Sequence, residues 1–329
     1  MRVIRRLTLA LSTAVIVVLA LSACSVGEDA INPDGTVNLS AVTLNVGDQA
    51  GIQQAILEAS GALDGAQYKV QWAQFPAAAP LLESLKSQAI DVGYTGDAPF
   101  INALAAGAKI SAISATKASG ANGLAIIVPQ NSPIHSVADL RGKTVSPTTQ
   151  GSIGHYELLA ALKEASVSAQ DTTISFLDPV NAAAAFKSGD IDAWSTWDPY
   201  TAVAQVEDHA RIIRDAEGIS SKLGLLSAND DAIADKAKHV AMTDFATRFG
   251  KALTWAEQHP TEYTRIYGKL TGRPENVSSL VAERSQRSPA PLDKANIQAL
   301  QTVADQYLEF GVIRRPVVVA DHTNQLSAQ

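Results

Sequence analysis

The chain has 329 residues, of which 46% are hydrophobic and 18% charged, and its 26 basic and 33 acidic residues give a formal net charge of −7. The acidic balance argues against a basic surface for nucleic acid, so an anion site must be local, built from oriented backbone groups and one or two cations. The single cysteine excludes an intrachain disulfide. A hydrophobic core must therefore supply the stability, and about 300 residues can bury roughly 75% of their unfolded surface.

The N-terminus has the parts of a secretory signal. Arg2, Arg5 and Arg6 precede an apolar run over residues 7–20, and small residues follow it. A membrane-spanning helix needs roughly 20 apolar residues, and this run is shorter. We therefore expect residues 1–23 to be a signal peptide. Its removal takes away three arginines and no acid, which changes the net charge from −7 to −10.

Cys24 stands at the expected cleavage point. The segment Leu21-Ser22-Ala23-Cys24 resembles the bacterial lipobox, in which the cysteine receives a diacylglycerol and becomes the mature N-terminus. Two or more acyl chains hold a protein stably on a membrane surface, which a single chain does not. The following residues are rich in turn formers, so residues 24–40 are predicted to be a lipidated cysteine and a flexible tether. The alternative is a chance cysteine beside an ordinary cleavage site.

Strand and helix patterns alternate through the first part of the chain. Strands alternating with helices imply a mostly parallel sheet with helices on both faces. The expected strands cover residues 42–47, 68–72 and 90–94, and the expected helices cover residues 52–59, 80–87 and 96–106.

The second part of the chain continues the α/β pattern and then becomes helical. Gly311 is the expected stop of the last amphipathic helix. The expected strands cover residues 124–129, 143–145 and 223–228, and the expected helices cover residues 137–140, 156–165 and 293–310, with mainly helical structure from residue 244 onward.

Two stretches 101 residues apart repeat one pattern without a gap. Residues 85–97 and 186–198 share Lys, Ser, Ile, Asp, Thr and Asp at the same places. Each copy is typical of a helix end, a tight turn, a buried strand and a polar turn that opens another helix. The repeat indicates two similar lobes that face a common cleft. The alternative is chance similarity between two ordinary α/β units.

The repeat and the alternating strands and helices together predict a chain that folds into two α/β lobes. The first is expected to contain residues 41–125 and 225–329 and the second residues 126–224, with two chain crossings near 121–128 and 222–229 acting as a hinge. One continuous doubly wound domain is the alternative, although its length is near the upper limit for a single core.

Three polar turns stand where a strand hands over to a helix: Thr95-Gly96-Asp97, residues 149–152 and residues 196–200. Helix N-termini leave backbone N–H groups unpaired and carry partial positive charge, so they accept anions readily. In open α/β sheets, ligands lie beyond the carboxyl ends of the strands. The turns therefore predict a binding cleft, and the alternative is that their polar residues only cap helices.

These turns resemble the signatures of a known family, the aliphatic sulfonate-binding proteins of ABC importers. The similarity covers roughly residues 42–315, and a wider group of similar fold binds nitrate, taurine and thiamine precursors. It implies a two-lobe fold like that of type II periplasmic binding proteins. The matching segments are residues 95–99, 131–134, 137–143, 151–155, 192–200 and Ser285-Gln286-Arg287, of which 192–200 is the most specific.

By that resemblance, a sulfonate lies between the lobes against Gly96, Gly151 and Ser152, and Arg287 supplies the cation. An arginine fork to two oxyanion oxygens is strong and directional. The alternative for Arg287 is a structural salt bridge between the lobes, and Arg284 is a weaker competitor for the ligand.

Further residues of these turns complete the candidate site. Trp194, Trp197 and Tyr200 are spaced to line the organic part of a ligand, with one tryptophan expected in the core. For Asp97 and Asp198 three roles are open: each caps its helix, pairs with Arg287 across the cleft, or meets the amine of a zwitterionic ligand. The remaining candidates are Thr95 beside Gly96, Gln49 as a closing residue, and His155 as a ligand donor or a structurally bonded histidine. Ile153-Gly154 departs from the serine run that related proteins more often have.

The predicted function is an extracytoplasmic lipoprotein that binds a small organic anion, most simply an alkanesulfonate, and delivers it to an ABC permease. A monomer without cofactor or metal is expected. Alternatives are another ligand of the group, namely taurine, nitrate, an arylsulfonate or a thiamine precursor, a signalling or adhesion lipoprotein, and an enzyme on the same scaffold. The desulfinases that resemble this fold use a cysteine nucleophile, and the only cysteine here is Cys24.

Overall fold

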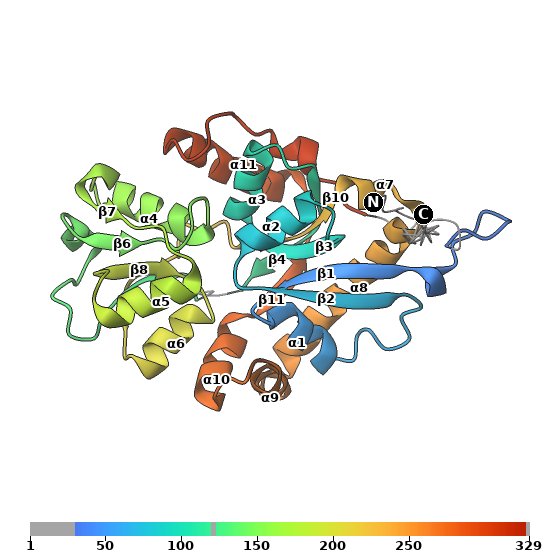
Figure 1. Ribbon diagram of the computed structural model, residues 1–329, viewed down its shortest axis with the longest axis horizontal. Coiled ribbons are helices and arrows are strands. Elements are labelled where there is room, and N and C mark those ends of the chain that lie inside the picture. Colours follow the sequence, from blue (N-terminus) through green and yellow to red (C-terminus); the bar gives the residue numbers. More distant parts are fainter. Residues whose placement is uncertain (1–29, 120–122, 327–329) are drawn as a thin grey trace, which may run out of the picture.

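The computed structural model describes residues 30–119 and 123–326. Two α/β lobes lie side by side along the long axis of the molecule (Figure 1). The predicted signal peptide and Cys24 lie outside the described residues. Within the described ranges, no helix combines the length and the apolarity that crossing a membrane requires.

Lobe I is built on a six-stranded mixed sheet with the order β11-β4-β10-β3-β1-β2. Strands β1, β2 and β3 run parallel, whereas β10 runs antiparallel to β3 and β4, and β11 is an antiparallel edge strand. The strands are β1 (Thr43–Gln49), β2 (Lys69–Phe75), β3 (Val92–Gly96), β4 (Ile110–Ala118), β10 (Leu223–Asn229) and β11 (Arg287–Ala290).

Helices cover both faces of this sheet (Figure 1). One buried apolar cluster lies under α1, α8, α9 and α10, and a second lies under α2, α3 and α11. The helices are α1 (Ile52–Ala59), α2 (Ala78–Lys86), α3 (Asp97–Ala105), α7 (Asp230–Ala234), α8 (Lys236–Gln258), α9 (Pro260–Thr271), α10 (Glu275–Arg284) and α11 (Lys294–Glu309), with 3-10 turns at Leu39–Ala41 and Val319–His322.

Lobe II is built on a five-stranded sheet with the order β7-β6-β8-β5-β9, in which β5 is antiparallel to both of its neighbours. Its apolar residues form two clusters, one on each side of β5 and β8. The elements are β5 (Ala125–Val128), β6 (Thr144–Ser146), β7 (Thr173–Ile174), β8 (Ala193–Thr196), β9 (Arg211–Asp215), α4 (Ile153–Glu164), α5 (Pro179–Ser188) and α6 (Tyr200–Glu207), with 3-10 turns at Val137–Leu140 and Ala169–Asp171.

This arrangement confirms the predicted two-lobe α/β fold, and the chain passes between the sheets twice, after β4 and after β9. Strand β10 begins at Leu223, two residues before the predicted lobe boundary. Four strands were not predicted: β4, β7, β9 and β11. Strand β4 consists mostly of alanine, serine and threonine and has only two isoleucines, so it lacks a clear apolar pattern. Strand β11 contains Pro289, which an edge strand tolerates because it need not donate to a neighbour.

The internal repeat is a real structural equivalence. Asp91 Oδ2 accepts a 2.9 Å hydrogen bond from the backbone N–H of Asn45, and Asp192 Oδ2 accepts a 2.8 Å bond from that of Thr144. In both lobes the repeated aspartate thus ties its own strand to the start of the parallel neighbour. Gln88 and Gly189 take the same left-handed turn, with φ of 61° and 83°.

Residues 30–40 were predicted to belong to a flexible tether, but in the structure they are packed on lobe I. Ile31 and Val37 pair in an antiparallel bridge, and Ala30 is only 3% exposed. Ile31, Val37 and Leu39 pack against the cluster under α8. Apolar residues inside the turn-rich segment explain the difference, because they gain more from burial than a free tether would give them. Residues 30–40 are therefore a packed hairpin of lobe I.

Candidate functional site

A cavity of about 380 Å³ lies between the lobes, and both contribute to its wall. Its volume falls within the range of small-molecule sites. We call it the interlobe cavity. Its apolar wall includes Ile52, Ile56, Ala77, Ala78, Pro80, Leu82, Pro99, Ala103, Leu124, Ile153, Phe249 and Leu253. Its polar wall includes Gln49, Gln53, Glu83, Tyr94, Asn102, Thr149, Gln150, Ser152, Trp197, Asp198, Arg284, Ser285 and Arg287.

Four helices begin at this wall, because β1, β2, β3 and the turn after β6 each hand over to a helix there. Unpaired N–H groups and the helix dipole make each beginning attractive to an anion. The buried carboxyl of Asp48 already caps α1 through the N–H groups of Gln53 and Gln54. No side chain caps α2, whose first residues Ala78 and Ala79 line the cavity. The start of α2 is therefore open to a ligand.

Arg287 is a cation held in place by uncharged groups. Its Nε donates to Thr116 Oγ1 over 2.9 Å, its Nη2 donates to the carbonyl of Lys222 over 2.6 Å, and its guanidinium lies 6.0 Å from the ring centre of Tyr94. Over residues 30–119 and 123–326, no carboxylate lies within ion-pair distance of it. Its charge is available to an anion in the cavity.

Arg284 has a different environment. Its Nη1 lies 3.5 Å from Asp198 Oδ1 and its Nη2 donates to Gln205 Oε1 over 2.7 Å, so it joins α10 of lobe I to lobe II. Burial raises the pKa of Asp198 to about 6, although Arg284 and the N–H of Ala202 oppose the rise. The salt bridge between lobes that was considered for Arg287 is thus made by Arg284.

Asp97 does not reach the cavity. Its carboxyl is 1% exposed, accepts a hydrogen bond from the hydroxyl of Ser221 and a 2.7 Å bond from the N–H of Ala98. Burial raises its pKa, and the bonds from Ser221 and Ala98 and the charge of Arg287 oppose the rise. Of the roles considered for Asp97, the structure shows the bond at the start of its helix.

His155 is bonded inside lobe II. Its Nδ1 accepts from the N–H of Gly151 over 3.2 Å, and burial lowers its pKa to about 4. A neutral ring with an accepting Nδ1 carries its proton on Nε2. Ser152 caps α4 through the N–H of His155 and donates its own proton to the carbonyl of Pro147. Gly151 and Ser152 do line the cavity, but these bonds occupy the Gly151 amide and the Ser152 hydroxyl.

The aromatic and closing residues divide between core and cavity. Trp197 lines the cavity, whereas Trp194 is 2% exposed and packs between Phe186 and Tyr200. Tyr200 donates to the carbonyl of Pro76 over 2.8 Å, another contact between lobes.

Two lobe I candidates follow the same division. Gln49 lines the cavity and donates to the carbonyl of Tyr94 over 2.7 Å. Thr95 is fully buried, its hydroxyl 3.3 Å from that of Ser227. In short, the structure brings Gln49, Gly96, Gly151, Ser152, Trp197, Asp198 and Arg287 to the cavity, and leaves Thr95, Asp97, His155, Trp194 and Tyr200 off its wall.

Sequence reasoning missed several residues of the wall. The start of α2 at residues 77–80 and the side chains of Phe249 and Leu253 carry no polar motif. Their only signal is position: residues 77–80 follow the carboxyl end of a strand, where ligands gather. Metal ligation has no support in the described ranges, which contain no cluster of three or more His, Cys, Asp or Glu residues that could hold an ion.

Two α/β lobes that the chain connects twice, with a cavity between them, form the architecture of periplasmic binding proteins. The model of the NMT1/THI5-like family matches residues 69–263, and the chain belongs to this family. A protein named aliphatic sulfonates-binding protein from Escherichia coli strain K12 is 32% identical over 283 residues, which cover 84% of this chain and 87% of that protein.

Two solved structures are similar over nearly the whole described chain. One is the alkanesulfonate-binding protein SsuA from Xanthomonas axonopodis pv. citri bound to MOPS, with a TM-score of 0.80 and 27% identity, covering 86% of this chain and 98% of that one. The other is the periplasmic aliphatic sulphonate-binding protein SsuA from Escherichia coli, with a TM-score of 0.75, 28% identity and coverage of 87% and 94%. These relatives are binding proteins, and the chain is a binding protein rather than an enzyme.

Proposed function

We propose that this protein binds an organic sulfonate, in the first place an alkanesulfonate, in the interlobe cavity and passes it to the permease of an ABC importer. The observation that carries the proposal is Arg287, a cation without an ion-pair partner among the described residues, at a wall where helices begin. A sulfonate places one negative charge on three oxygens, which suits one guanidinium and backbone N–H groups. Relatives at 32% and 29% identity are named for aliphatic sulfonates.

The apolar wall supports an organic ligand rather than a bare inorganic anion. Ile52, Ile56, Phe249 and Leu253 have no polar group to offer an oxyanion. Each methylene that leaves water for such a wall contributes about 0.8 kcal/mol. Taurine, nitrate, arylsulfonates and thiamine precursors are the competing ligands of the wider group. Nitrate fits least, because it would leave this wall without a partner.

The cellular setting is part of the proposal. Residues 1–23 direct export, Cys24 carries the lipid anchor that holds the protein on the outer side of a membrane, and the protein acts as a monomer. The proposed division places residues 41–125 and 225–329 in lobe I and residues 126–224 in lobe II, to which the structure adds the hairpin of residues 30–40 and the start of β10 at Leu223 on the side of lobe I. The relative from Escherichia coli that is described as periplasmic supports an extracytoplasmic location.

A ligand screen by thermal unfolding tests the proposal. Alkanesulfonates of increasing length, taurine, arylsulfonates and nitrate are added at about 100 times the expected Kd, where binding stabilises the fold by about 2.7 kcal/mol. We expect alkanesulfonates to raise Tm and R287A to reduce that rise by about half or more. The matched control is R265A, because Arg265 is an exposed arginine paired with Glu262 on α9. If no sulfonate raises Tm, the ligand class is wrong.

A further inference from the structure

The hairpin of residues 30–40 shortens the stretch of chain between the proposed lipid anchor and the packed part of lobe I. The N–H of Asn32 donates to the carbonyl of Thr36, and the N–H of Asn38 donates to that of Ala30, both over 2.8 Å. Asp34 Oδ1 accepts from the N–H and the hydroxyl of Thr36, over 2.9 and 2.6 Å. The hairpin is therefore closed by its own bonds.

The hairpin is also fastened to the lobe. Its face towards α8 carries Ile31 and Val37, which pack on the lobe I core beside the buried Ala30. Lys236, the first residue of α8, donates to the carbonyl of Gly35 over 2.8 Å. The blue loop at the right of Figure 1 shows the hairpin at the end of lobe I that lies farthest from lobe II.

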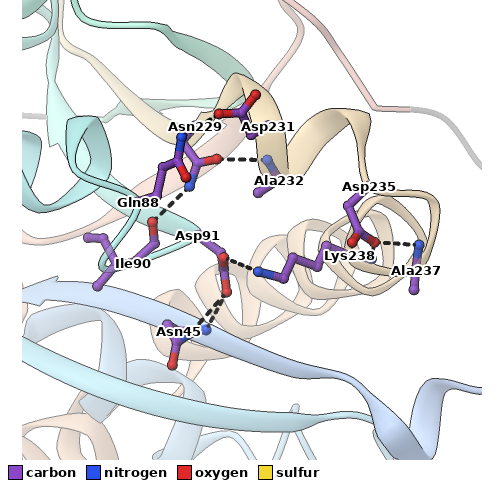
Figure 2. Close-up of polar contacts among 10 residues, drawn as sticks. All are labelled: Asn45, Gln88, Ile90, Asp91, Asn229, Asp231, Ala232, Asp235, Ala237 and Lys238. Carbon is purple, nitrogen blue, oxygen red and sulfur yellow. Dashed lines mark hydrogen bonds and ion pairs between the residues drawn. The ribbon is translucent and has the colours of Figure 1, made fainter. Parts of the chain in front are cut away.

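The start of α8, whose Lys236 holds the hairpin, is itself tied to the sheet. Lys238, the third residue of α8, forms a 2.7 Å ion pair with Asp91, whose other oxygen accepts from Asn45 of β1. Asp235 caps α8 through the N–H groups of Ala237 and Lys238. Figure 2 shows these bonds converging from the sheet and the helix. The anchor end of lobe I is thus a fixed body.

Chain length then sets the reach of the anchor. A residue spans at most about 3.5 Å, so the six steps from Cys24 to Ala30 reach roughly 20 Å, whereas a free segment up to residue 41 would reach roughly 60 Å. Residues 45 and 91 stand at the starts of their strands, while Gln49 and Gly96 at the strand ends line the cavity. The anchored end is therefore opposite to the cavity.

We propose that the hairpin makes this end of lobe I a membrane-facing surface, held within about 20 Å of the lipid headgroups. The opposite end of the molecule, with lobe II and the cavity, is not held at the lipid. The whole protein therefore pivots on the anchored end of lobe I to bring the cavity to the permease. The proposal rests on the lipidation of Cys24 in the proposed function, and its partner is the lipid surface itself.

Energy transfer on vesicles tests it. The full-length acylated protein is placed on phosphatidylcholine vesicles that carry a short-range acceptor on their headgroups. Cys24 is the only cysteine, so when it is acylated an introduced cysteine is the only free thiol to label. S40C reports on the end of the hairpin that joins lobe I, and Q170C on the exposed edge of lobe II. We expect strong transfer from S40C and weak transfer from Q170C.

Two variants separate the hairpin from the anchor. The double variant I31D/V37D releases the hairpin from lobe I. An insertion of ten Gly/Ser residues after Glu28 lengthens the segment between Cys24 and the hairpin while leaving the hairpin intact. Both are expected to lower transfer from S40C by at least half, because the reach grows from roughly 20 Å to more than twice that. An unchanged Tm response to ligand confirms that each variant is folded.

The outcomes are distinct. The mass of the N-terminal peptide is measured first, and an unacylated Cys24 overturns both this inference and the lipoprotein part of the proposed function. Acylation with equal transfer from S40C and Q170C overturns this inference alone. So does transfer from S40C that neither variant lowers. Sulfonate binding is unaffected in every case, because the cavity lies at the other end of the strands.

Discussion

The two copies of the repeat end in aspartates with opposite surroundings. Asp97 is sealed in lobe I by Ser221 and the start of α3, and its carboxyl makes no ion pair with Arg287. Asp198 lies on the cavity wall and pairs with Arg284 of the other lobe. The same local motif therefore leaves one arginine neutralised and the other available. The difference arises from what each opposing element places beside the motif, not from the motif itself.

The largest expected effect compares the first aspartates of the two copies. D91A should lower the free energy of unfolding by about 3 kcal/mol or more, because Asp91 is 3% exposed and its loss leaves Lys238 without its partner. D192A should cost about 1–2 kcal/mol, because Asp192 only accepts from the backbone of Thr144. Urea unfolding measures both, and equal losses would contradict the comparison.

The second prediction concerns pH. The folded-state pKa of Asp198 is about 6, above its ordinary value of 3.8, so the folded protein holds this proton more tightly than the unfolded chain. The stabilisation is complete below about pH 4 and is lost as pH rises through 6. Relative to D198N, which has no such proton, the wild type should lose about 3 kcal/mol over that range. Urea unfolding at several pH values measures this difference. If the free energies of unfolding of the wild type and D198N change equally with pH, the prediction is wrong.

The third prediction compares the two cavity arginines. R287A should weaken sulfonate binding by about 1.5–3 kcal/mol, roughly 10- to 150-fold, because it removes a charge-assisted bond to the ligand. R284A should weaken it less than tenfold, because Arg284 is already paired with Asp198. Titration calorimetry with the best alkanesulfonate measures both. The control R287K keeps the positive charge but loses the two-pronged guanidinium geometry, so its Kd should lie between those of the wild type and R287A. A larger effect for R284A reverses the assignment.

The smallest effect tests the turn of the repeat. Gly189 has φ of 83°, so G189Q should destabilise lobe II by about 1 kcal/mol. Gln88 has φ of 61°, so Q88G relieves a similar strain but loses the bond to Asp231 and should change stability by less than about 1 kcal/mol. Thermal unfolding measures the pair. A stabilising G189Q would show that the two turns are not equivalent.

The sequence predicts those features that depend on local pattern. The helix over residues 52–59 has the predicted bounds, and the glycine stop at Gly311 has φ of 70°. Strand β11 is not predicted, because its four residues include a proline and gain their pairing only from β4. Its position nevertheless fixes Arg287, so the resemblance located this residue while its strand was missed.

The site is predicted in outline because a strand end beside a helix start is a local signal. Which side chain then faces the cavity is not local. Trp194 and Trp197 belong to one motif, but only Trp197 lines the cavity, since Trp194 points into the lobe II core. The bond between the N–H of Gly151 and His155 arises from the tight turn into α4, and spacing alone did not reveal it.

Tyr156 has a consequence for how the two lobes move. Although it belongs to α4 of lobe II, its ring is 2% exposed within the lobe I core and lies edge-on to Tyr307, which itself donates to the carbonyl of Ser152. Withdrawing such a ring would expose a large apolar area to water. We therefore expect the lobes to keep this contact on opening and to rotate about Tyr156. Displacements on opening grow with distance from it, so a pair of spectroscopic probes flanking Tyr200 and Pro76 would report occupancy with the greatest sensitivity.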